Sequence, residues 1–184
     1  IGLAGLSQTY YLRKHFNCQS FGAAFFGIFY ALSGYMAAYS WNIMWLDCIV
    51  LFPLILLGLE RLVKQGRWGM YCICLGLSIL SNYYISIMIC IYMVLYFIAL
   101  LIMEKRKTLK EYGKTFLRFC LSSLGAGGFA AAVLVPEVMA LQSTASGSST
   151  FPKTFSSYFS LIDMLSRHMG NVEVVIGLDH CPNI

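Results

Sequence analysis

Long apolar stretches separated by short basic segments run along the sequence, and this pattern predicts helices that cross a membrane. A helix needs about 20 residues to cross the hydrocarbon core of a bilayer. About 45 mostly apolar residues lie between the basic segments around Lys14 and Lys64, which is enough for two crossings. The turn between these crossings is predicted at Asn42, because Trp41 and Trp45 on either side of it are typical of the membrane–water interface.

A second apolar stretch, Trp68–Met103, is too long for a single crossing. Its 36 residues would form a helix about 54 Å long, whereas the hydrocarbon core is about 30 Å thick. We therefore predict two helices that turn at Asn82-Tyr83, the first of them short enough to cross only partly. Pro136 is expected to end a last span, because proline interrupts helices. The five predicted spans cover residues 20–39, 44–62, 68–82, 84–103 and 116–135.

The composition changes after Pro136. Nine of the sixteen residues in Gln142–Ser157 are Ser or Thr, which is typical of an exposed linker. Apolar residues then recur at helical spacing over 158–169, which predicts a short amphipathic helix on the outer membrane surface. Val172–Leu178 has the composition of a short strand. The chain is thus predicted to consist of a transmembrane module, residues 1–137, and an extracytoplasmic segment, residues 138–184.

The distribution of charge predicts the orientation of the spans. Two crossings between successive basic segments place all three segments on one side, with 11 of the 13 Lys and Arg residues. The positive-inside rule makes that side cytoplasmic. The net charge of +5 then divides into +8 on the cytoplasmic side and −3 outside. It reflects orientation and does not indicate an acidic partner. The three segments are Arg13–His15, Arg61–Arg67 and Lys105–Arg118.

Composition narrows the class of protein. Hydrophobic residues make up 59% of the chain and charged residues only 11%, against about 25% charged in soluble domains. A water-soluble domain, a disulfide-rich secreted module, a disordered chain and a nucleic-acid binder are excluded, and the expected fold class is an all-α, polytopic membrane bundle. The seven cysteines form no C-x-x-C pair and are interpreted as small hydrophobic residues. Because the sequence starts at Ile1 without Met or a leader, we expect an internal piece of a larger protein.

Polar residues at the predicted outer membrane edge are candidates for chemistry. Charge near the bilayer is costly, so Asp47 either reaches water at the interface or faces a wet cavity, and Asn42 presents the same choice. Asn82 and Tyr83 either line a cavity or form a tight turn. Glu137, at a predicted helix exit, is either solvated or part of the same cavity. These five residues form the candidate outer-face cavity.

The tail contains two further candidate pairs. Arginine suits phosphate oxygens, so Arg167 and His168 are candidate contacts to a lipid-linked phosphate; the alternative is that both are solvated on a surface helix. Asp179-His180 offers too few ligands for a metal site. We predict no metal site and no cofactor, while dependence on a divalent metal stays open.

Several local sequences, in the same order along the chain, resemble the YfhO family of bacterial membrane proteins. The resemblance covers roughly residues 1–140 and is looser in the tail. The segments that carry it are Ala31-Leu32-Ser33-Gly34-Tyr35, Asn42-Ile43-Met44-Trp45-Leu46-Asp47 with Pro53-Leu54 after it, Glu60-Arg61-Leu62, and Ser81-Asn82-Tyr83-Tyr84-Ile85.

The resemblance implies a longer multispan protein of the bacterial cytoplasmic membrane with a GT-C-type glycosyltransferase architecture. Such enzymes move a sugar from a polyprenyl-phosphate carrier to an acceptor outside the cytoplasm, here a cell-wall polymer such as lipoteichoic acid. Their catalytic acidic residue usually lies in the first extracytoplasmic loop, which would precede Ile1, so the catalytic residue is unknown and Asp47 is not assigned that role. Two alternatives stay open: a multispan transporter or flippase, and a non-catalytic membrane scaffold.

Overall fold

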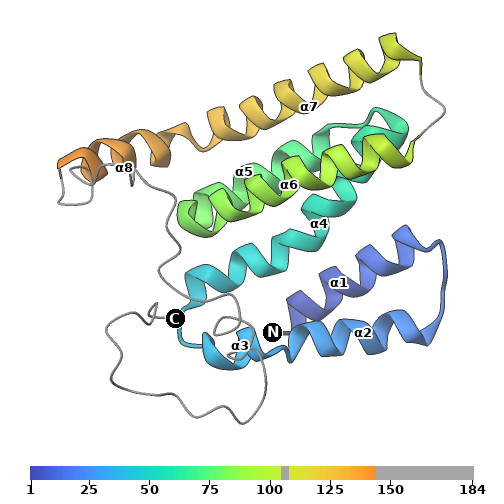
Figure 1. The fold of residues 1–184 in the computed structure, drawn as a ribbon. Coiled ribbons are helices and arrows are strands. Elements are labelled where there is room, and N and C mark those ends of the chain that lie inside the picture. Colours follow the sequence, from blue (N-terminus) through green and yellow to red (C-terminus); the bar gives the residue numbers. More distant parts are fainter. Residues whose placement is uncertain (105–107, 144–184) are drawn as a thin grey trace, which may run out of the picture. The chain divides into compact units, whose positions relative to one another are not determined.

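The computed structural model describes residues 1–104 and 108–143, and α-helices make up this part of the chain (Figure 1). No strand occurs among the described residues, so the predicted all-α class is confirmed there. The surface helix and the strand predicted in the tail lie outside the described residues. The helices are α1 (Gly2–His15), α2 (Phe21–Ala31), α3 (Gly34–Ala38), α4 (Ile43–Gln65), α5 (Gly69–Ser81), α6 (Tyr83–Met103), α7 (Leu109–Phe129) and α8 (Ala131–Ser143).

Three helical segments of the described chain are long and apolar enough to cross a membrane. They are Phe21–Ala38, which comprises α2 and α3, and the helices α4 and α6. A fourth crossing would consist of α7 and α8, which are bent by 72° relative to each other. Helix α5 has 13 residues and is therefore about 20 Å long, less than the hydrocarbon thickness of about 30 Å. The total of five crossings stays a prediction.

Large apolar side chains also cover the outside of these helices. On α2, Phe25, Phe26 and Phe29 are each more than half exposed, and on α6 the same holds for Ile91 and Leu95. Such surfaces would be unusual on a soluble monomer. On membrane-spanning helices they are the surfaces that lipid chains cover.

The helices around the last predicted span extend beyond it on both sides. Helix α7 begins before residue 116, because Thr108 caps it and donates its backbone N–H to the Glu111 carboxylate at 3.0 Å. The helix breaks at Ala130, two residues after the glycine-rich segment 125–128, where glycine weakens helical structure. Helix α8 then continues through Pro136, which was expected to end the span.

Helix α4 is the centre of the described bundle. It packs against α1, α5, α6 and α7, and α5 in turn packs against α6 and α7. The approach of α4 to α5 is close because Gly58 faces the backbone: a Cβ at this position would lie 2.7 Å from Tyr71 Cα. Helices α1 and α2 meet in the same way, since a Cβ at Gly27 would lie 2.7 Å from the Gly5 carbonyl oxygen. Small residues at contacts are typical of membrane helices.

A proline inside α4 explains one polar contact between α2 and α4. Pro53 has no N–H to donate to the carbonyl of Ile49, four residues before it. The Tyr30 hydroxyl of α2 donates to that carbonyl at 2.7 Å. Because an unpaired carbonyl is costly in hydrocarbon, Tyr30 supplies the hydrogen bond that Pro53 removes.

Candidate functional site

Basic side chains from three sequence segments gather at one end of the bundle. The Arg61 guanidinium of α4 lies 3.4 Å from the Tyr10 hydroxyl of α1. The Arg118 guanidinium of α7 lies against Gly66, which ends α4. The ends of α1 and α4 and the first half of α7 therefore share one end, as the predicted topology requires. The assignment of this end to the cytoplasm stays a prediction.

The five candidates for an outer-face cavity lie toward the opposite end. Asn42 precedes α4 and Asp47 lies in its second turn, while Cys48, next to Asp47, has its Sγ 3.8 Å from the Asn82 carbonyl oxygen. The start of α4 therefore lies beside the turn between α5 and α6. Tyr83 follows in this turn, and Glu137 of α8 lies near enough to interact with it electrostatically. The structure thus brings Tyr83 and Glu137 together.

The other candidates at this end differ in their surroundings. The Asn82 side-chain oxygen accepts a hydrogen bond from the Ile85 N–H at 2.9 Å and caps α6, which is the geometry of a tight turn. Asn42 is half-buried and donates its backbone N–H to the Tyr39 carbonyl at 2.9 Å. Asp47 is exposed and has no ion-pair partner among the described residues. Arg167 and His168, with Asp179 and His180, lie outside the described residues.

Next to the turn between α5 and α6, a buried polar cluster joins α4, α5 and α6. The hydroxyl oxygens of Ser78 and Ser86 lie 2.8 Å apart, and the Cys48 Sγ is 3.5 Å from the Ser78 carbonyl oxygen. All three side chains are almost fully buried. These contacts satisfy polar groups inside the bundle and hold the turn in place.

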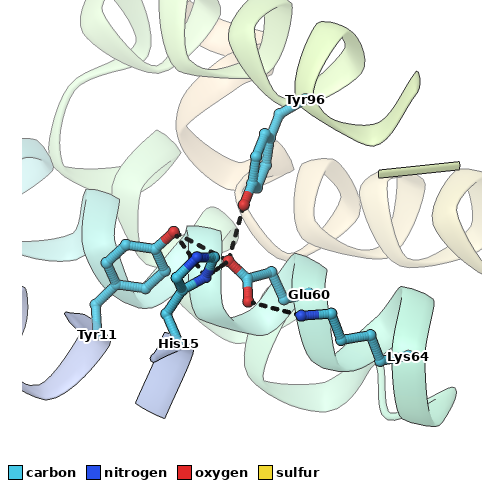
Figure 2. A network of polar contacts seen from close by, with 5 residues as sticks. All are labelled: Tyr11, His15, Glu60, Lys64 and Tyr96. Atoms are coloured by element: carbon cyan, nitrogen blue, oxygen red, sulfur yellow. Dashed lines mark hydrogen bonds and ion pairs between the residues drawn. The ribbon is translucent and has the colours of Figure 1, made fainter. Parts of the chain in front are cut away.

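The polar network around Glu60 lies at the basic end and was not predicted as a site (Figure 2). Glu60 is only 3% exposed. Its Oε1 accepts hydrogen bonds from the hydroxyls of Tyr11 at 2.9 Å and Tyr96 at 2.8 Å, and it lies 2.7 Å from His15 Nδ1. Its Oε2 lies 3.5 Å from Lys64 Nζ. One buried carboxylate thus connects α1, α4 and α6.

Helical spacing places these side chains on common faces. Tyr11 and His15 are four residues apart on α1, and Glu60 and Lys64 are four residues apart on α4, so each pair points the same way. Burial, together with the nearby Tyr96 and Glu60 side chains, raises the pKa of Tyr11. The Tyr11 hydroxyl therefore stays a neutral donor, and the donors together offset the cost of burying the carboxylate.

The sequence contained one signal for this network. Glu60 is one of two acidic residues, with Asp47, in the predicted span 44–62, and a charged residue within a span needs a partner. Its partners His15 and Tyr96 are 45 and 36 residues away in sequence, so their identity follows only from the way the helices pack.

A cavity of about 330 Å³ lies beside Glu60, and we call it the basic cavity. Four cationic side chains and one carboxylate line it. Among the described residues, no group of three or more His, Cys, Asp or Glu side chains could hold a metal ion. The lining residues are Lys14, Leu57, Glu60, Arg61, Lys64, Gln65 and Arg67.

Comparisons with known proteins give one match. The model of a family described as "Bacterial membrane protein YfhO" matches residues 1–175. No curated protein matches the chain, and no solved structure matches it.

Proposed function

The chain belongs to the YfhO family of bacterial membrane proteins, and on this premise we propose that it is part of a membrane glycosyltransferase. The reaction proposed is transfer of a sugar from a polyprenyl-phosphate carrier to an extracytoplasmic cell-wall acceptor such as lipoteichoic acid. The observation that supports the proposal is that the start of α4, with Asp47, lies beside the turn that carries Asn82 and Tyr83, at the bundle end opposite the basic segments.

The residues at that end have the chemistry that sugar transfer needs. A general base must take the proton of the acceptor hydroxyl as it attacks the anomeric carbon. Hydroxyl and carboxylate groups such as those of Tyr83 and Glu137 are suited to bind and orient sugar hydroxyls. On this proposal the catalytic base belongs to a loop ahead of Ile1, and residues 138–184 are extracytoplasmic.

The proposal also assigns a role in the tail. The departing carrier phosphate gains negative charge as the glycosidic bond breaks, and a nearby cation stabilises it. Arg167 and His168 are proposed for this contact, because arginine binds phosphate oxygens in a planar, bidentate manner.

The test is transfer of a radiolabelled sugar by the full-length protein in proteoliposomes that contain the polyprenyl-phosphate sugar and lipoteichoic acid. The wild-type protein is expected to label the polymer. Glu137→Gln is expected to reduce labelling about tenfold, because it removes substrate contacts worth about 1.4 kcal/mol. The control Lys110→Gln, at the other end of the bundle, is expected to label as wild type does. Arg167→Ala is expected to reduce labelling at unchanged expression, and equal labelling would reject the phosphate contact. If the wild-type protein labels no polymer, the proposed glycosyltransferase activity is wrong.

A flippase is the second candidate, because the 72° break between α7 and α8 and the short α5 match the interrupted helices of transporters. The same proteoliposomes distinguish the two. A flippase exposes a fluorescent polyprenyl-phosphate lipid to an external quencher without an acceptor polymer, whereas a transferase consumes the carrier only when the acceptor is present.

A further inference from the structure

We propose that the basic cavity binds the phosphate group of an anionic lipid in the cytoplasmic leaflet. The cavity lies at the end of the bundle opposite Tyr83 and Glu137, so this site is separate from the sugar-transfer site proposed above. The inference rests on the charge that lines the cavity, on the way its arginines are held, and on its place at the end of a membrane-spanning helix.

The charge of the cavity calls for an anion from outside the protein. Four cationic side chains line it, and among the described residues none of Lys14, Arg61 and Arg67 pairs with a carboxylate. The one acidic group, Glu60, is already occupied by its donors and by Lys64. An ammonium group has three donors, and the 3.5 Å contact of Lys64 with Glu60 leaves the others available for a ligand.

Neighbouring side chains hold the Arg61 guanidinium at the cavity, and a backbone turn places Arg67 beside it. The Arg61 guanidinium donates to Met70 Sδ at 3.3 Å and to the Tyr10 hydroxyl at 3.4 Å, which orients its plane. Gly66 has φ +73°, the left-handed conformation that ends α4. The turn brings the Arg67 N–H to within 3.3 Å of the Arg61 carbonyl oxygen. Two guanidinium groups at one cavity are suited to phosphate oxygens.

The position of the cavity favours a lipid over a soluble anion. The cavity lies at the end of α4, a membrane-spanning helix. Trp68, three residues after the end of α4, is 55% exposed, as expected of a residue in the interfacial aromatic belt. Leu57, 3% exposed, lines the cavity one turn deeper than Arg61. Basic pockets between helices on the cytoplasmic side bind lipid headgroups, so the phosphate belongs to a headgroup at this depth.

The test is titration of the full-length protein in detergent with phosphatidylglycerol or phosphatidylcholine, with bound lipid counted by native mass spectrometry. Wild type is expected to prefer phosphatidylglycerol. Arg67→Gln is expected to weaken the binding of phosphatidylglycerol about fivefold, and the double variant Lys14→Gln/Arg67→Gln about 25-fold. The reason is that each basic residue near the membrane surface contributes about 1 kcal/mol to lipid binding. Both side chains are exposed, so the variants are expected to unfold at the wild-type temperature.

The matched control is Lys110→Gln/Lys114→Gln, which removes two exposed charges of α7 that do not line the cavity. It is expected to bind phosphatidylglycerol as wild type does. Equal weakening in the control and in the cavity variant would overturn the proposal, because general surface charge would then explain binding. Displacement of the lipid by millimolar inorganic phosphate would also overturn it, since the site would then be one for a soluble anion. These measurements do not depend on sugar transfer.

Discussion

Glu60 shows how a carboxylate is kept inside a membrane-spanning helix. Its Oε1 accepts hydrogen bonds from two tyrosine hydroxyls and lies beside His15. Each of these partners comes from a helix other than α4. A hydrogen bond to a charged group is worth about 1.5–3 kcal/mol, and leaving the group unpaired costs at least as much. The stability of the contact between α1, α4 and α6 therefore depends on single hydroxyl groups.

At this scale we predict that Tyr96→Phe lowers the free energy of unfolding by about 1.5–3 kcal/mol, because it removes one donor to the buried Glu60 carboxylate. The measurement is equilibrium unfolding of the full-length protein in detergent. Tyr92→Phe is the control: Tyr92 lies one turn away, its ring stacks on Tyr96 at 6.1 Å, and its hydroxyl donates to none of the described residues. Equal destabilisation by both variants would show that the hydrogen bond to Glu60 is not the cause.

Residue-level features could be predicted only in part. The position of Asn82 at a turn followed from the length of the apolar stretch around it, and the structure shows its side chain capping α6. The Glu60 network could not be predicted, because spacing of three or four residues identifies neighbours within one helix and says nothing about which helix lies opposite. Tyr83 and Glu137 were predicted to line one cavity; the structure places them near enough to interact electrostatically, and the shared cavity stays a prediction.

At the scale of elements, the length of an apolar stretch between basic or turn residues located the helices reliably. Helices α4 and α6 each occupy such a stretch. Helix α1 was not predicted, since its sequence mixes polar, aromatic and basic residues without a clear apolar stripe. The last span was wrong at Pro136, because a helix can continue through a proline that removes one hydrogen bond, whereas the glycine-rich segment before Ala130 breaks it.

The pairing of Tyr30 with the Ile49 carbonyl leads to a double-mutant prediction. Tyr30→Phe is expected to destabilise the full-length protein by about 1 kcal/mol, because the carbonyl that Pro53 leaves free loses its donor. In a Pro53→Ala background the alanine N–H can bond to that carbonyl, so the same Tyr30→Phe change is expected to cost much less. Unfolding of the four proteins in detergent gives the coupling, and strictly additive effects would disprove this role of Tyr30.

At the scale of the whole molecule, the charge pattern and the packing agree. Arg13–His15, Arg61–Arg67 and the described part of the third segment are far apart in sequence, yet the helices bring them to one end. The sequence predicted this grouping from span count alone, because an even number of crossings returns the chain to the same side. Packing partners such as α4 with α1 could not be predicted from hydropathy.

The predicted orientation of the membrane spans can be tested with reporter insertions. Green fluorescent protein inserted after Gly66 or Thr108 is expected to fluoresce, because the positive-inside rule places both in the cytoplasm. Alkaline phosphatase inserted after Ser81 is expected to be active, because it would lie outside. Phosphatase activity after Thr108 would contradict the topology and would mean that Trp68–Met103 crosses the membrane once.

The Glu60 network also has a consequence for the order in which the protein is made. His15 and Tyr11 are synthesised before Glu60, but Tyr96 follows 36 residues later. The nascent chain must therefore carry α4 in the membrane with an incompletely bonded carboxylate until α6 arrives beside it. In this interval Tyr11 and His15 of α1, with Lys64 of α4 itself, are the partners already made for the carboxylate, so the contact between α1 and α4 stabilises the charge before α6 completes the network.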